Sequence, residues 1–221
     1  ESVKEFDLNM HTARLLMDEP FFAAISRRID KRASYAIPTA GVMVNQDTGQ
    51  FEMLYNPEFF GRLTDLERRD VLKHEYYHIL FLHVTSRMPE GVNPRIWNIA
   101  ADLAINSHLN NLPEGGLRPG KAPFENLPIG MSAEWYLANM PSFESNTGGG
   151  GGPSGQGDPS SSEAKDPGDA DDADDAGGDT PEQETSGGDG IPDTLDDHSG
   201  WGEASQEAKD MARERLKDVV N

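Results

Sequence analysis

The chain of 221 residues contains no cysteine. Disulfide bonds, iron–sulfur clusters, thiolate zinc sites and a cysteine nucleophile are therefore excluded. No apolar run approaches the ~20 residues that span a bilayer, so we expect no membrane contact. Basic residues are few, with 19 Lys and Arg against 39 Asp and Glu, and no basic patch indicates binding of nucleic acid. We expect a cytoplasmic protein, or a virion-associated one if a phage encodes it.

Hydrophobic residues make up only 35% of the chain, and the acidic residues are unevenly placed. Residues 145–200 contain fifteen acids, one base and a run of five glycines. Such a segment cannot bury enough apolar surface to offset the entropy that is lost on ordering. We therefore predict a folded domain over residues 1–144, a disordered acidic linker over 145–200 and a helix over 201–221. This helix either packs back on the domain or leads into a further one.

The pattern within residues 1–144 is mostly helical. Apolar spacing and end signals predict helices over residues 3–17, 21–29, 64–84, 94–109 and 132–140. Two short apolar runs, 39–45 and 51–55, predict strands, and the turn residues between them predict an antiparallel hairpin. Thr64, followed three residues later by Glu67, predicts a capping box at the start of the clearest helix. The expected fold class is α+β, zincin-like, mostly helical with a small antiparallel sheet.

The candidate chemistry lies in residues 74–78, which form an HExxH motif. Residues i and i+4 lie about 40° apart around a helix, so His74 and His78 point at one spot. A zinc ion accepts such a pair as two of its protein ligands. Glu75 lies beside the pair, where its carboxylate can take a proton from water that the metal activates. The alternative is a surface helix that carries two incidental histidines.

A zinc hydrolase usually takes three protein ligands, and two residues are candidates for the third. If the helix continues past His83, this histidine faces away from the metal, and no glycine is present to end the helix earlier. Asp102 is an acid among apolar residues on the next predicted helix, where small alanines allow close approach. A buried acid needs a compensating charge, and a dication provides one. We predict His74, His78 and Asp102 as the ligands, with His83 as the rival to Asp102.

Asn98 and Asn106 stand four residues before and after Asp102, so all three share one face of their helix. Either these asparagines orient the metal ligands through hydrogen bonds, or they only cap loops.

Other segments extend the pattern around this motif. They are 15–22, 39–42, 55–59, 71–78, His83, Arg87 and 98–106. In order and spacing they resemble the putative metallopeptidase domain of VWA-like proteins, which is found in bacteria and phages. The resemblance implies zinc on His74 and His78, Glu75 as the catalytic acid/base and Asp102 as the third ligand, although His83 also recurs in the family pattern. Residues 196–201 resemble the family's connection to a von Willebrand factor A-like domain.

The expected function is zinc-dependent hydrolysis of a peptide or protein substrate. The resemblance also suggests that residues 51–55 form an edge strand that pairs with extended substrate. A different hydrolase on the same metal, such as an amidase, shares this chemistry. The other alternative is a catalytically inactive module with a structural metal, whose acidic linker recruits an ATPase–VWA assembly or a phage particle.

Overall fold

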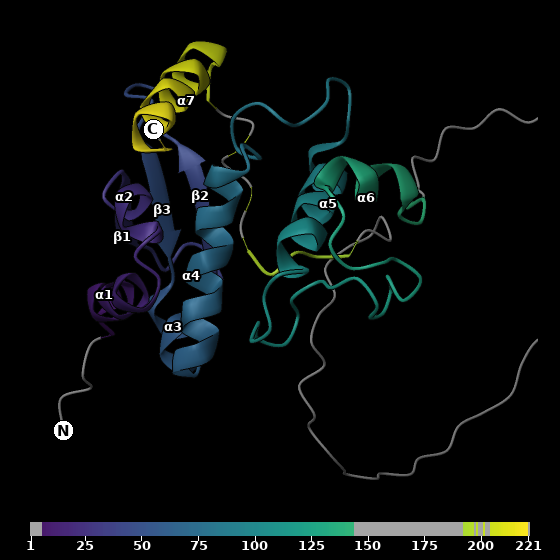
Figure 1. Ribbon diagram of the computed structural model, residues 1–221, viewed down its shortest axis with the longest axis horizontal. Coiled ribbons are helices and arrows are strands. Elements are labelled where there is room, and N and C mark those ends of the chain that lie inside the picture. Colours follow the sequence, from purple (N-terminus) through teal and green to yellow (C-terminus); the bar gives the residue numbers. More distant parts are fainter. Residues whose placement is uncertain (1–5, 144–191, 197, 199–200, 202–203, 221) are drawn as a thin grey trace, which may run out of the picture.

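The computed structural model describes residues 6–143, 192–196, 198, 201 and 204–220. These residues form helices and one small sheet, so the architecture is α+β, as the sequence predicts (Figure 1). Most of the predicted acidic linker lies outside the described residues. Within the described part of the chain, no helix has the length and apolar character that a membrane crossing requires.

The sheet contains three strands in the order β1-β3-β2. They are β1 (Ile29–Ala33), β2 (Ala40–Val44) and β3 (Phe51–Tyr55). β2 and β3 form the predicted antiparallel hairpin, with Val42 opposite Met53. Asn45 shapes the turn, because its side-chain oxygen accepts hydrogen bonds from the backbone N–H groups of Asp47 and Thr48. The hairpin is therefore specified by local sequence.

The sheet is mixed, which corrects the prediction of a purely antiparallel one. β1 pairs with β3 in parallel, with Ile29 opposite Phe51. The predicted helix over residues 21–29 is shorter in the structure, because α2 (Phe22–Ser26) ends early and Ile29 begins β1. Only Ile29 is buried in β1, so this strand lacks the apolar alternation that reveals a strand in a sequence. Because β1 pairs with one side of β3 and β2 with the other, β3 is the central strand and β2 is an edge strand.

Side-chain caps define where the main helices begin. The remaining helices are α1 (Leu8–Asp18), α3 (Pro57–Arg62), α4 (Asp65–Leu80), α5 (Pro94–Asn106), α6 (Ala133–Asn139) and α7 (Gln206–Val220). α4 begins with the predicted capping box, in which Thr64 and Glu67 each accept a hydrogen bond from the other's backbone N–H. Asn93 caps α5 by accepting from Arg95 N–H, and Pro94 occupies the first turn. Each such cap contributes about 1 kcal/mol to stability.

α4 ends at Leu80, earlier than predicted. Leu82 adopts a φ of 60°, in the left-handed region. Its N–H donates to the carbonyl of Ile79, and the N–H of His83 donates to the carbonyl of His78, both at 3.0 Å. This is a Schellman motif, which usually has glycine at the left-handed position. Because leucine takes that position here, the sequence shows no stop signal, and the turn directs His83 back toward α4.

α4 lies between the sheet and the pair formed by α5 and α6 (Figure 1). It contacts β2 on one side and α5 on the other. Tyr76 of α4, Trp97 of α5 and Tyr136 of α6 are fully buried in the shared core. α7 contacts β2 and α2, so the C-terminal helix packs back on the domain, which is one of the two arrangements that the sequence allows.

Candidate metal centre

α4 places the motif residues in the core, beside α5. His74 and His78 are at most 2% exposed, and Glu75 is fully buried. The Nε2 atoms of the two histidines lie 2.8 Å apart, because positions i and i+4 share one helix face. The structure therefore brings the motif residues together at one buried point.

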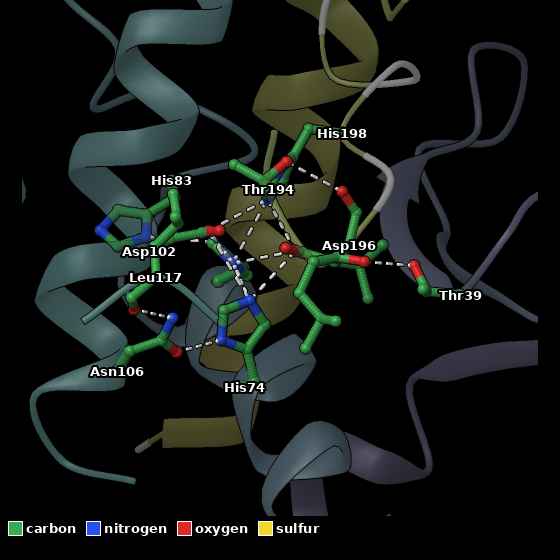
Figure 2. Close-up of polar contacts among 12 residues, drawn as sticks. Thr39, His74, His83, Asp102, Asn106, Leu117, Thr194, Asp196 and His198 are labelled. Carbon is green, nitrogen blue, oxygen red and sulfur yellow. Dashed lines mark hydrogen bonds and ion pairs between the residues drawn. The ribbon is translucent and has the colours of Figure 1, made fainter. Parts of the chain in front are cut away.

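Asp102 reaches the same point from α5 (Figure 2). Its Oδ1 atom lies 3.3 Å from His78 Nε2 and 3.7 Å from His74 Nε2. The side chain is fully buried, and neither of its oxygens has a hydrogen-bond partner among the described residues. Buried Ala101 and Ala104 are small enough to let α5 approach α4 closely. Asp102 thus lies within ligand distance of the histidine pair, and its role as a ligand stays a prediction.

Two further residues reach this point from the C-terminal segment (Figure 2). Asp196 Oδ2 lies 3.0 Å from His74 Nε2, and His198 Nε2 lies 2.7 Å from Asp196 Oδ2. One ligand atom from each of five residues falls within 4.8 Å of all the others. We call these five the His/Asp cluster: His74, His78, Asp102, Asp196 and His198.

Asp196 and His198 belong to the stretch for which the sequence predicts a disordered linker, so sequence reasoning missed both as site residues. In the structure their side chains are buried, each about 7% exposed. One signal was present, because an acid and a histidine two residues apart lie in the segment that resembles the family's connection to its second domain. Its distance from the HExxH motif along the chain concealed its role.

The spacing of the His/Asp cluster fits a metal ion. Zinc binds imidazole nitrogen and carboxylate oxygen at ~2.0–2.2 Å, so two donors of a tetrahedral site lie roughly 3.3 Å apart. His78 Nε2 lies 3.3 Å from Asp102 Oδ1 and 3.3 Å from Asp196 Oδ2. His198 Nε2 lies 3.4 Å from His78 Nε2 and 3.4 Å from Asp102 Oδ1. Three imidazoles and two carboxylates are a donor set that zinc and related transition metals accept.

Hydrogen bonds to Nδ1 orient two of the imidazoles. Asn106 donates its amide N–H to a backbone carbonyl at 2.8 Å, so its Oδ1 accepts from His74 Nδ1 at 2.7 Å. Thr194 donates its hydroxyl to the carbonyl of Asp196 at 3.1 Å and accepts from His198 Nδ1 at 3.3 Å. In both rings a proton on Nδ1 leaves the lone pair of Nε2 directed at the cluster, as metal binding requires.

His83 lies behind the cluster and is not part of it. Its Nδ1 atom lies 3.3 Å from Nδ1 of His78. Burial, reinforced by the charges of His78 and Arg87, lowers the pKa of His83 to about 2, so this ring is neutral. A neutral His83 can accept the Nδ1 proton of His78 and so orient it. His83, the rival to Asp102, therefore contacts His78 from outside the cluster, whereas Asn98 lines a cleft beside it.

The histidines and the aspartates of the cluster shift each other's pKa values. Burial by itself lowers the pKa of His74, but the carboxylates of Asp196, Asp102 and Glu75 together outweigh it and raise this pKa to about 10. The same balance raises the pKa of His198 well above its ordinary value. Burial favours a raised pKa for Asp196, yet the two histidines hold it well below its usual range. The buried carboxylates therefore attract positive charge, which a dication supplies.

Glu75 stands apart from the cluster. Neither of its carboxylate oxygens has a hydrogen-bond partner among the described residues. Burial, with the charge of Asp196 adding to it, raises the pKa of Glu75 to about 8. A buried carboxylate in a native protein is almost always paired, with a bound water or ion where no protein group serves. Glu75 therefore suits a proton-transfer role beside the cluster.

A cleft of about 630 Å³ opens onto the cluster. Its lining includes Pro38, Arg95, Asn98, Asp196, His198 and Trp201. Two of the five cluster residues, both from the C-terminal segment, line this cleft, and the other three do not. A molecule that enters through the cleft therefore meets the C-terminal segment first.

The predicted substrate strand, residues 51–55, is not an edge strand. These residues form β3, which has a strand on each side, so its backbone groups are already paired. The prediction was wrong because β1, which covers one side of β3, is not visible in the sequence pattern. The edge strand that contacts α4 is β2.

Comparisons with known proteins point to the same chemistry as the motif. A family model described as "Putative metallopeptidase domain" matches residues 4–219, nearly the whole chain. An uncharacterized protein of Thermotoga maritima is 33% identical over 70 residues, which cover 32% of this chain and 18% of that protein. The chain therefore aligns with less than a fifth of that relative's length. No solved structure matches this chain.

Proposed function

This chain belongs to the family described as a putative metallopeptidase domain, and we propose that it is a zinc-dependent peptidase. One observation carries the proposal. The HExxH helix, α4, directs two imidazoles into a buried cluster of metal-binding side chains, beside a glutamate whose oxygens lack partners among the described residues. This combination of a metal site and an adjacent proton acceptor is what hydrolysis of a peptide bond requires.

In this proposal His74, His78 and Asp102 hold the zinc ion. When bound, zinc supplies a Lewis acid that polarises a peptide carbonyl and brings the pKa of water toward ~7. Asn106 and His83 keep the two α4 imidazoles turned so that their Nε2 atoms face the ion. The substrate is a peptide or an unfolded protein segment that enters through the cleft.

Glu75 is the proton carrier in this proposal. Its carboxylate accepts a proton from the attacking water and passes that proton to the departing amine. Burial raises the pKa of Glu75 above its ordinary value, which makes its carboxylate a stronger base toward the attacking water. Because Glu75 is fully buried, bulk water does not compete for this proton.

The variant Glu75→Gln tests the proposal. Glutamine keeps the size of the side chain but cannot accept the proton, so cleavage of an unstructured peptide mixture should fall by about 10²-fold or more. The cleaved peptides are counted by mass spectrometry after long incubation at high enzyme concentration. Zinc content should stay at that of the unmutated protein. The matched control is Glu58→Gln, an exposed residue of α3, and equal cleavage by Glu75→Gln and the unmutated protein would contradict the proposal.

A non-catalytic role is the second candidate, and the number of donors favours it. Five donors around one point resemble a closed, structural metal site more than a catalytic one. The domain would then be a metal-stabilised binding module for an ATPase–VWA assembly or a phage particle, in the cytoplasm or in a virion. Such a module binds zinc as the peptidase does, but neither the unmutated protein nor any variant cleaves peptide.

A further inference from the structure

The C-terminal segment covers the cluster from the side of β2. We use the name closing segment for the described residues 192–196, 198 and 201. The carbonyl of Leu195 accepts a hydrogen bond from the Thr39 hydroxyl at 2.6 Å (Figure 2). The indole N–H of Trp201 donates to the carbonyl of Val42 at 2.8 Å. The closing segment is therefore attached at two points, one to the residue before β2 and one to β2 itself, on either side of the residues that reach the cluster.

The edge of β2 is where an extended peptide would bind. The carbonyl of Thr39 accepts from Asn56 N–H and so faces β3. Because backbone direction alternates along a strand, the N–H and C=O groups of Ala40 and Val42 face away from β3. A peptide bound beside the metal could add to the sheet through these groups. One of these groups, the carbonyl of Val42, already accepts the hydrogen bond from the indole N–H of Trp201.

Asp196 and His198 also fill the metal site. Catalytic zinc sites have three protein ligands and keep a further position for water, whereas sites with a complete protein ligand set are structural. If His74, His78 and Asp102 are the three ligands, the closing segment raises the number of donors to five. Its two residues are also the members of the cluster that line the cleft. They therefore stand between the cleft and the other three ligands.

Trp201 anchors the closing segment. Its side chain is buried, and its ring centroid lies 4.2 Å from that of His198 and 4.9 Å from that of His78. Asp193 makes an exposed ion pair with Arg95 at 3.4 Å. The closing segment has no regular secondary structure in its described residues 192–196, so a few side-chain contacts hold it in place. A segment held in this way can leave while α4 and α5 stay folded.

We propose that the closing segment is an intramolecular inhibitor, in which Asp196 and His198 are zinc ligands that occupy the place of water and substrate. The segment must leave the edge of β2 before a peptide can bind there. This inference rests on the proposed peptidase function. It predicts a resting protein that binds zinc tightly and cleaves peptides slowly.

The double variant Asp196→Asn/His198→Gln tests the inference in the full chain. Its matched control is Asp18→Asn/His108→Gln, which makes the same two chemical changes at exposed positions outside the closing segment. Each protein is loaded with cobalt(II), whose visible absorption strengthens when five ligands are reduced to four. We expect the double variant to bind one metal ion at least tenfold more weakly and to absorb more strongly. Peptide cleavage should rise at least tenfold over the control, and adding Glu75→Gln should abolish that gain.

The outcomes separate the inference from the function on which it rests. An unchanged cobalt spectrum would show that Asp196 and His198 are not ligands, and complete loss of metal binding would show that they are permanent ones. Either result overturns the inference. A changed spectrum without cleavage in any variant would overturn the peptidase function and the inhibition together, and would leave both residues as ligands of a structural site.

Trp201→Ala provides a second test that keeps all five ligands. Loss of the anchor should raise peptide cleavage by a smaller factor than the double variant does, with circular dichroism unchanged. Trp135→Ala, at a partly exposed position of α6, is the matched control. Cleavage below that of the unmutated protein would overturn the inference, because the closing segment would then support catalysis.

Discussion

The two halves of the His/Asp cluster are held in place in different ways. The helical half, His74, His78 and Asp102, projects from two capped helices that are packed into the core. The other half, Asp196 and His198, projects from a segment held by a few side-chain contacts to β2 and by the cluster itself. The geometry of the helical half is thus independent of a bound metal, whereas the other half depends on its partners. The comparison suggests a permanent metal-binding half and a removable one.

Removing one ligand from each half gives the sharpest contrast. His78→Ala should weaken zinc binding by about 1000-fold, because it removes a ligand from a rigid helix and leaves a buried hole. His198→Ala should weaken binding by only about tenfold, because the helical half of the cluster stays complete. Competition with a chromophoric chelator measures both affinities. Equal losses in the two variants would remove the distinction between the halves.

Removing the metal should loosen the two halves unequally. At zinc concentrations 100 times the dissociation constant, binding adds about 2.7 kcal/mol to the free energy of unfolding. Chelation should therefore lower the melting temperature by about 5–10 °C for a protein of this size. Hydrogen exchange followed by mass spectrometry should show faster exchange in residues 192–196 of the chelated protein than of the zinc-loaded protein, with α4 protected in both. Equal loss of protection in α4 would show that the helices also need the ion.

The hydrogen bond behind His74 can be tested within one helix. Asn106→Ala removes the acceptor for His74 Nδ1 and should weaken zinc binding by about 10- to 100-fold. Asn98→Ala, on the same face of α5 but lining the cleft, is the control and should leave zinc affinity unchanged. Isothermal titration with zinc measures both. An effect of similar size at Asn98 would argue against a specific role for Asn106.

The smallest expected effect concerns the turn that places His83. Leu82→Gly should raise the free energy of unfolding by about 1 kcal/mol, because glycine adopts a φ of 60° without the steric cost that leucine bears. Denaturant unfolding of the zinc-loaded protein measures this change. A clear loss of stability would mean that packing of the Leu82 side chain outweighs the relief of backbone strain.

The parts of the fold that were predictable have short-range causes. Thr64 and Glu67 signal the start of α4, and Asn93 and Pro94 signal the start of α5. Two short apolar runs with turn residues between them signal the hairpin. β1 escaped prediction because it has a single buried residue and exists through its pairing with β3. The early end of α4 escaped prediction because leucine occupies a position where glycine is usual.

The sequence by itself determined that His74 and His78 meet at one point, because a helix holds residues at i and i+4 in a nearly fixed geometry. It also singled out Asp102, because an acid among apolar residues needs a positive partner. Only the tertiary structure decided that Asp196 and His198 join them. Asp196 lies 122 residues beyond His74 along the chain, and no local periodicity encodes a contact across that distance. Attachment to the edge of β2 brings the closing segment to the cluster.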